Sequence, residues 1–218
     1  MKLRANKILL PLTCLLCCYT SALLAISPQQ TLLMEGNKRY VQGCSIHPRE
    51  DMKTRDVWLT KQAPLAIIVG CCDSRVPPEI IFDQGIGDLF VIRVAGNIVG
   101  PIELDSIKFA AIDLKTPLIV VLGHEDCAAV HAVLEGKGFA PSMENISPFL
   151  QSAIFESMKL PGHSLTNAID TNVRLVVEYL KTSAPLAELV KKNKLDIVGA
   201  RYDFHEGKVL FFSHDTKK

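Results

Sequence analysis

The sequence lacks an excess of charge of either sign. Its 24 basic and 23 acidic residues leave a formal net charge of +1 over 218 residues. Nucleic-acid-binding proteins usually carry a surplus of lysine and arginine, so this balance argues against that class. Internal repeats, low-complexity segments and linkers between domains are also missing. A chain of this length is long enough for one well-buried domain and short for two, so we expect one domain.

The first 25 residues differ from the rest of the chain. Three basic residues precede an apolar run over residues 8–24, and the small residue Ala25 follows it. This arrangement is typical of a secretory signal peptide. The alternative is an uncleaved membrane anchor, which the proline and hydroxyl residues within the run disfavour. We therefore expect residues 1–25 to be removed and residues 26–218 to be exported as one domain, to a bacterial periplasm.

Removal of this segment would leave few cysteines. It takes away three positive charges and no acidic residue, so the net charge changes from +1 to −2, and the cysteines fall from seven to four. The four that remain are Cys44, Cys71, Cys72 and Cys127. In an exported chain, four cysteines ordinarily suggest two disulfides. Metal binding competes with this interpretation, because Cys71 and Cys127 follow the ends of apolar runs and lie near a histidine.

The apolar runs predict an α/β fold. Four of them are widely spaced, at residues 65–70, 89–94, 118–123 and 195–199. The stretches between them are long enough for crossover helices, so the pattern predicts a mostly parallel sheet of four strands flanked by helices. Residues 209–213 follow a Glu-Gly turn signal and predict an antiparallel edge strand.

The remaining segments predict helices and one long loop. The predicted helices cover residues 30–41, 78–82, 102–115 and 166–182. The first is amphipathic, stops at Gly43 and forms an N-terminal helical arm. Residues 136–164 are rich in glycine, proline and serine, which predicts a loop with short helical pieces.

Two predicted strands end in side chains that bind metals. The run 65–70 is followed by Cys71-Cys72-Asp73-Ser74-Arg75, and the run 118–123 by His124-Glu125-Asp126-Cys127. Ligands collect at the carboxyl ends of strands in open α/β sheets. Two sulfurs and an imidazole suit zinc, and three protein ligands leave the fourth position open for water, so we predict a catalytic zinc. Neighbours on a strand point to opposite faces, and the spacing alone leaves open whether Cys71 or Cys72 is the ligand.

Both segments resemble the signature of the β-class carbonic anhydrases, Cys-x-Asp-x-Arg followed by His-x-x-Cys. The likeness is close over residues 62–130 and looser over residues 198–203. It implies one Zn²⁺ per chain on Cys71, His124 and Cys127, and a homodimer or homotetramer. The implied reaction is the reversible hydration of carbon dioxide to bicarbonate and a proton by a zinc-bound hydroxide.

A carboxylate and a guanidinium beside the first ligand suit this chemistry. Asp73 is two residues from Cys71 and can orient the hydroxide as a hydrogen-bond acceptor. Arg75 can hold this carboxylate ionised and off the metal as a bidentate pair, and the resemblance assigns the same catalytic dyad. The alternative is a surface salt bridge. The resemblance also places Gln62, Phe90 and Phe109 at a carbon dioxide pocket, although both phenylalanines would serve equally as core residues.

Three other functions compete with this one. An enzyme that hydrolyses carbon disulfide or carbonyl sulfide on the same scaffold would share the motif. A non-catalytic zinc protein is disfavoured because a structural site needs a fourth protein ligand and no dyad. A thiol-redox protein is disfavoured because Cys71 and Cys72 lack the two-residue spacer of the usual motif. We expect no nucleic-acid partner, and no membrane association after signal cleavage.

Overall fold

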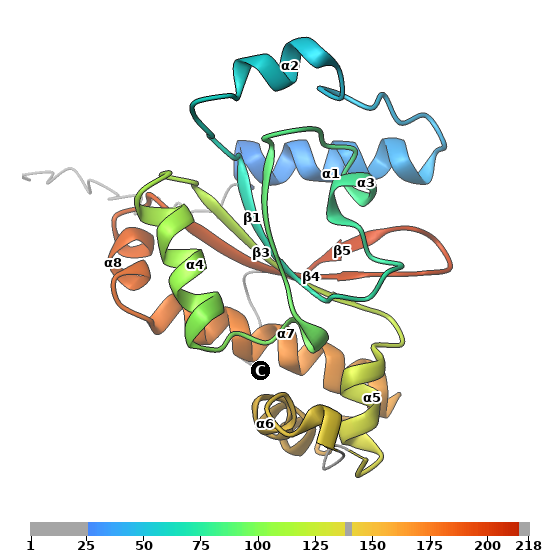
Figure 1. Ribbon diagram of the computed structural model, residues 1–218. Helices are drawn as coiled ribbons and strands as arrows, with labels where there is room; N and C mark the ends of the chain where they lie inside the picture. Colours follow the sequence, from blue (N-terminus) through green and yellow to red (C-terminus); the bar gives the residue numbers. More distant parts are fainter. Residues whose placement is uncertain (1–25, 138–140, 214–218) are drawn as a thin grey trace, which may run out of the picture.

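A five-stranded sheet organises the fold in the computed structural model, which describes residues 26–137 and 141–213 (Figure 1). The strands are β1 (Ala66–Gly70), β2 (Leu89–Arg93), β3 (Leu118–His124), β4 (Asp196–Tyr202) and β5 (Val209–Phe211). Their order is β2-β1-β3-β4-β5, with the first four parallel and β5 antiparallel to β4. The predicted α/β fold is confirmed. The expected signal peptide, residues 1–25, lies outside the described residues.

Helices cover both faces of this sheet (Figure 1). They are α1 (Pro28–Val41), α2 (Met52–Val57), α3 (Pro78–Ile81), α4 (Pro101–Ile112), α5 (Ala128–Leu134), α6 (Ser147–Ser157), α7 (Ser164–Thr182) and α8 (Leu186–Lys191), with short 3₁₀ turns η1 (Ala95–Asn97) and η2 (Pro141–Met143). The four predicted helices are confirmed with small shifts of their ends. Among the described residues, no helix has the length and apolar character needed to cross a membrane.

The central strands β1 and β3 are buried along their whole length, which explains their continuous apolar sequence. Alternate side chains enter two different cores. Ile67 and Val69 face a core shared with α4 and α7, whereas Ile68 packs with Leu33 of α1 and Ile81 of α3. Because both faces are fixed in this way, the carboxyl ends of β1 and β3 are held side by side.

The N-terminal helix α1 packs closely on the rest of the chain. Asn37 donates from its side-chain amide to the carbonyls of Ile81 and Gly207, at 3.1 and 3.0 Å, and accepts from the Val209 N–H at 2.9 Å. Gly36 permits this approach, because a Cβ there would lie 1.8 Å from the Phe82 carbonyl oxygen. The predicted arm is therefore anchored to α3 and to the hairpin between β4 and β5.

The segment 136–164 contains more helix than predicted. The eleven residues of α6 bury Leu150, Ala153 and Ile154 at helical spacing. Pro148 lies in the first turn, where proline is tolerated. The prediction of a loop with short helical pieces underestimated the helix content here, because the flanking glycine, proline and serine residues obscured a short apolar period.

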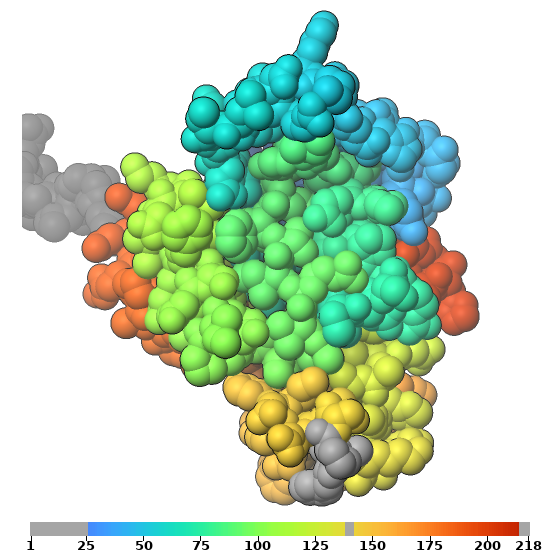
Figure 2. All heavy atoms as spheres, viewed as in Figure 1, coloured from blue at the N-terminus to red at the C-terminus, as the bar shows by residue number. Residues whose placement is uncertain are grey.

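One edge of the sheet remains open in the part of the chain that the structure describes. Strand β2 pairs with β1 alone, and Figure 2 shows its green atoms and the yellow-green atoms of α4 uncovered on one face. Three apolar side chains of α4 are exposed here: Ile102, Phe109 and Ile112.

Candidate metal centre

The three predicted ligands converge at the carboxyl edge of the sheet. Cys71 is the first residue after β1, His124 is the last residue of β3, and Cys127 precedes α5 as its N-cap. Their ligand atoms all lie within 4.8 Å of one another, and all three residues are buried. Adjacent parallel strands end at the same edge, which is why residues about fifty positions apart in the sequence meet here.

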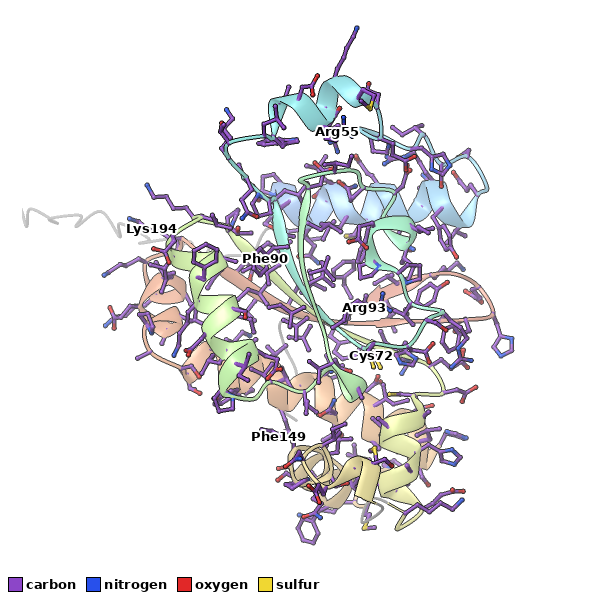
Figure 3. All side chains as sticks on the ribbon, in the orientation of Figure 1. Arg55, Cys72, Phe90, Arg93, Phe149 and Lys194 are labelled. Atoms are coloured by element: carbon purple, nitrogen blue, oxygen red, sulfur yellow. The ribbon has the colours of Figure 1, made fainter. Side chains whose placement is uncertain are left out.

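The structure decides between the two neighbouring thiols. Cys71 is buried in the cluster, whereas Cys72 is exposed, and Figure 3 labels it beside the site. Cys72 therefore lies outside the ligand cluster, and partial burial and the neighbouring Cys71 raise the pKa of its thiol. Cys44, Cys71, Cys72 and Cys127 are all free, and the interpretation as two disulfides is wrong for these residues.

The histidine presents one nitrogen to the centre. His124 Nδ1 lies 2.7 Å from the Glu125 carbonyl oxygen, which can only accept, so Nδ1 carries the proton. The other ring nitrogen, Nε2, is fully buried and has no hydrogen-bond partner among the described residues. His124 Nε2 therefore presents a free lone pair beside the two cysteine sulfurs. One imidazole nitrogen and two sulfurs are ligands that zinc prefers, so Cys71, His124 and Cys127 fit this metal.

The two thiols have different acidities. A hydrogen bond from Cys127 is the main cause that lowers the pKa of Cys71, to about 3, with further help from His124 and the Gly96 N–H. The same contact and burial raise the pKa of Cys127. One thiolate therefore forms readily, and the second needs the charge of a cation between the sulfurs.

Residues outside both motifs hold the ligand loop. Arg93 donates from Nε to the Cys71 carbonyl at 3.0 Å and from Nη2 to the Asp73 carbonyl at 2.6 Å. The Gly96 N–H lies 3.4 Å from Cys71 Sγ, and Asn172 of α7 donates to the Gly96 carbonyl at 2.8 Å. Gly96 has φ of 70°, a conformation that favours glycine. Sequence reasoning assigned Arg93 and Gly96 no role beyond the family likeness and did not identify Asn172.

Asp73 and Arg75 form the bidentate pair that the sequence predicted. Arg75 donates from Nε to Oδ1 at 3.0 Å and from Nη2 to Oδ2 at 2.8 Å, and its backbone N–H also reaches Oδ1. The side-chain hydrogen bond from Arg75 is the main cause that lowers the pKa of Asp73, to about 2. Asp73 Oδ2 lies 3.9 Å from His124 Nε2, so an ionised carboxylate borders the metal position.

An aromatic ring contacts both Arg75 and His124. The ring of Phe204, in the turn between β4 and β5, lies 4.1 Å from the Arg75 guanidinium carbon and 5.4 Å from the His124 ring. Nothing in the local sequence of this turn indicated such a contact, because the three residues come from distant parts of the chain.

The three predicted pocket residues lie elsewhere in the same chain. Phe90 and Phe109 contact each other, with ring centroids 6.4 Å apart. Arg93 pairs with Gly70, the last residue before the ligand Cys71. Phe90 is three residues earlier on β2, so its Cα lies about 10 Å from that of Arg93, away from the metal centre (Figure 3). Gln62 is exposed and precedes β1, whereas Cys71 follows that strand. One chain therefore does not bring these residues to its own metal centre.

Comparison with protein families supports the assignment of the site. A family model described as carbonic anhydrase matches residues 66–209, which include every residue of the metal centre and the Asp73–Arg75 pair.

Curated relatives and solved structures agree with this match. Carbonic anhydrase 2 of Mycobacterium tuberculosis is 35% identical over 190 residues, covering 84% of this chain and 90% of the relative. The carbonic anhydrase of Mycolicibacterium smegmatis is 37% identical over 187 residues, covering 84% and 91%. The solved structure of the beta-carbonic anhydrase CcaA superposes with a TM-score of 0.68 at 25% identity, covering 85% of this chain and 97% of that one.

Proposed function

This chain belongs to the β-class carbonic anhydrase family, and from that premise we propose how its residues hydrate carbon dioxide to bicarbonate and a proton. Cys71, His124 and Cys127 would hold the zinc ion. When bound, zinc supplies a Lewis acid that makes a hydroxide nucleophile available from water near neutral pH. Three protein ligands leave one position for this chemistry, whereas a structural zinc site would use four.

Asp73 orients the nucleophile. Its pKa of about 2 keeps the carboxylate ionised across the physiological range, so it acts as a hydrogen-bond acceptor and not as an acid. An oriented acceptor is needed because two thiolates neutralise much of the charge of the metal and weaken its effect on water. The distance of 3.9 Å between Asp73 Oδ2 and His124 Nε2 supports this role.

Arg75 keeps the carboxylate from becoming a ligand itself. A free carboxylate is a competent zinc ligand, and Asp73 is close enough to occupy the open position. The two hydrogen bonds from Arg75 engage both oxygens and turn them away from that role. The bidentate pair at the edge of the metal position is the single observation that carries this mechanism.

The test is the variant Arg75→Ala. We expect it to keep one zinc per chain and to lose carbon dioxide hydration by at least about 100-fold in a stopped-flow assay. Arg55→Ala, which removes an exposed arginine on α2 far from the site, is the matched control and should hydrate carbon dioxide normally (Figure 3). A folded, zinc-loaded Arg75→Ala protein with nearly normal activity would show that the pair is only structural.

The same assay separates the rival substrates. Carbon disulfide and carbonyl sulfide hydrolases share the metal chemistry, so the purified protein should be offered each compound in parallel. We expect rapid turnover of carbon dioxide and little release of sulfide. A higher rate with either sulfur compound would reassign the substrate.

We also propose that the working unit is a homodimer or a larger assembly. The β2 edge and the exposed side chains of α4 leave apolar surface that a second copy would cover. Gln62, Phe90 and Phe109 can line a carbon dioxide pocket only with the help of a second copy, because each lies away from the metal centre of its own chain. Solved relatives include two tetrameric beta-carbonic anhydrases from Sordaria macrospora.

Finally, we propose that the protein is exported to a bacterial periplasm. Residues 1–25 carry the basic flank, apolar run and small terminal residue of a signal peptide. Mass spectrometry of the native protein should find a chain that begins near Ile26, in the periplasmic fraction. An intact Met1 in the cytosol would overturn this proposal.

A further inference from the structure

The guanidinium of Arg75 needs more than its ion pair to stay in place. The arginine side chain is 56% exposed, whereas that of Asp73 is 13% exposed. Exposed ion pairs between long side chains gain little, because water competes and because fixing the side chain costs entropy. Arg75 has to hold Asp73 away from the open position on the metal, and this ion pair alone would hold it only weakly. A second contact to the guanidinium is therefore needed.

Phe204 supplies that contact. Its half-buried ring lies 4.1 Å from the Arg75 Cζ, so one face of the guanidinium stacks on an aromatic surface while its edge binds Asp73. Stacking and hydrogen bonding use different parts of a planar guanidinium and can be satisfied together. The ring restricts the torsions through which Arg75 would otherwise leave the carboxylate.

The phenylalanine is itself fixed from three sides. Its ring meets the Tyr202 ring edge-on at 5.6 Å and the His124 ring at 5.4 Å. Its backbone N–H donates to Glu125 Oε2 at 3.2 Å, and the Glu125 N–H donates to the Tyr202 carbonyl at 2.9 Å.

The turn that carries the phenylalanine is also closed. Asp203 Oδ1 accepts from the N–H groups of His205 and Glu206, each at 2.8 Å. Asp203 further exchanges backbone hydrogen bonds with Gly207 and Lys208. The ring therefore sits on a rigid support and not on a mobile loop.

We propose that Phe204 is a positioning residue that holds Arg75 against Asp73. This inference rests on the proposed role of the Asp73–Arg75 pair. Phe204 acts through Arg75, whose guanidinium its ring contacts. The hairpin between β4 and β5 is thereby part of the active site, although it carries none of the metal ligands.

The first experiment combines Phe204→Leu and Arg75→Ala in a double-mutant cycle. Phe204→Leu should keep one zinc per chain and lower kcat about tenfold in the wild-type background, with less than about a twofold effect in the Arg75→Ala background. Phe204→Tyr keeps the ring and should restore near-normal kcat. An equal loss in both backgrounds would show that Phe204 acts by general packing and would overturn the inference.

The second measurement does not depend on turnover. In the NMR spectrum, the Arg75 Nε–H should exchange slowly with water in the wild-type protein, because it is bonded to Asp73 and shielded by the ring. We expect Phe204→Leu to accelerate this exchange at least about tenfold. Without the ring, Arg75 should spend more time in conformations in which its hydrogen bond to Asp73 is broken. Phe211→Leu is the control, because it removes another half-buried ring from the same hairpin, one that packs on Phe82 and not on Arg75. This variant should leave the exchange rate of the Arg75 Nε–H unchanged.

These variants separate the possible failures. If Phe204→Leu does not fold, Phe204→Met provides the same comparison with a side chain of similar volume. Normal kcat and slow Arg75 exchange in either variant would overturn the inference alone, provided that Arg75→Ala is inactive. Normal activity of Arg75→Ala would instead overturn the proposed function on which it rests.

Discussion

Asn172 and Gly96 are joined by a hydrogen bond of 2.8 Å, and this bond links helix α7 to the residue that contacts the ligand Cys71. The Gly96 N–H points at Cys71 Sγ, so the amide of Asn172 holds in place the residue whose N–H contacts this sulfur. Asn172 is buried, and its loss would leave the Gly96 carbonyl without this donor.

We therefore expect Asn172→Ala to weaken zinc binding by roughly tenfold to 100-fold, as removal of an outer-shell partner of a metal ligand typically does. Competition with a chromogenic chelator measures this change. Asn167→Ala on the same helix is the matched control, because that side chain bonds the carbonyls of Leu160 and Pro161, away from the site. Equal zinc affinity in the two variants would contradict the coupling.

The assignment of the first ligand predicts opposite results for two adjacent cysteines. Cys71→Ser should lose most of its zinc, because Cys71 contributes a buried sulfur to the cluster. Cys72→Ser should keep one zinc per chain, because its side chain is exposed and outside the cluster. Atomic absorption on the two dialysed proteins checks both. Zinc retained by Cys71→Ser and lost by Cys72→Ser would reverse the assignment.

Asp83 anchors the segment after α1 and predicts a pH-dependent stability. Burial raises the pKa of its carboxyl, but hydrogen bonds from Arg39, Ile46 and His47 outweigh burial and lower the pKa overall. A carboxyl with a depressed folded-state pKa stabilises the fold above its unfolded value of about 4, and this contribution is lost as the pH falls through the folded-state value.

Asp83→Asn should accordingly lower the free energy of unfolding by about 3 kcal/mol at pH 7, because it leaves Arg39 without its charged partner. Urea unfolding at a series of pH values should show the difference from wild type shrinking below about pH 4. The exposed Asp113 gives the control Asp113→Asn, for which we expect a small effect. A difference that is constant with pH would exclude the charge as its origin.

The open β2 edge predicts association. At micromolar concentration, sedimentation should show at least a dimer, and Phe109→Glu should shift the population toward the monomer, because burial of a new carboxylate opposes contact at that face. If a second copy completes the carbon dioxide pocket, the same variant should also lose activity. Met158→Glu, at an exposed apolar position next to α6, is the control. A wild-type monomer under these conditions would argue against the assembly.

The sequence predicted the parts of this protein that depend on local patterns. Continuous apolar runs identified β1 and β3, since strands covered on both faces need no polar positions. Strand ends carrying thiols and a histidine located the metal centre, because parallel neighbours must end at one edge. Spacing alone could not choose between Cys71 and Cys72, which the structure separates by burial.

Other parts depend on contacts between distant segments and had no local signal. Phe204 meets Arg75 and His124 only after the hairpin has folded back over the ends of β1 and β3. In the sequence, Asn172 is a single polar residue on the otherwise apolar face of a helix. Its burial is explained only by its hydrogen bond to the Gly96 carbonyl, which lies far away in the sequence. The placement of Phe90 and Phe109 away from the metal required the register of β2 against β1.

The metal ligands come from two segments that are about fifty residues apart in the sequence, and this separation has a consequence for the lifetime of the protein in a cell. An unfolded chain does not present the three donors together, so chelation and folding form a single linked equilibrium. The folded population then depends on the supply of free zinc as well as on temperature. A shortage of the metal would therefore lower the free energy of unfolding as well as the fraction of active enzyme.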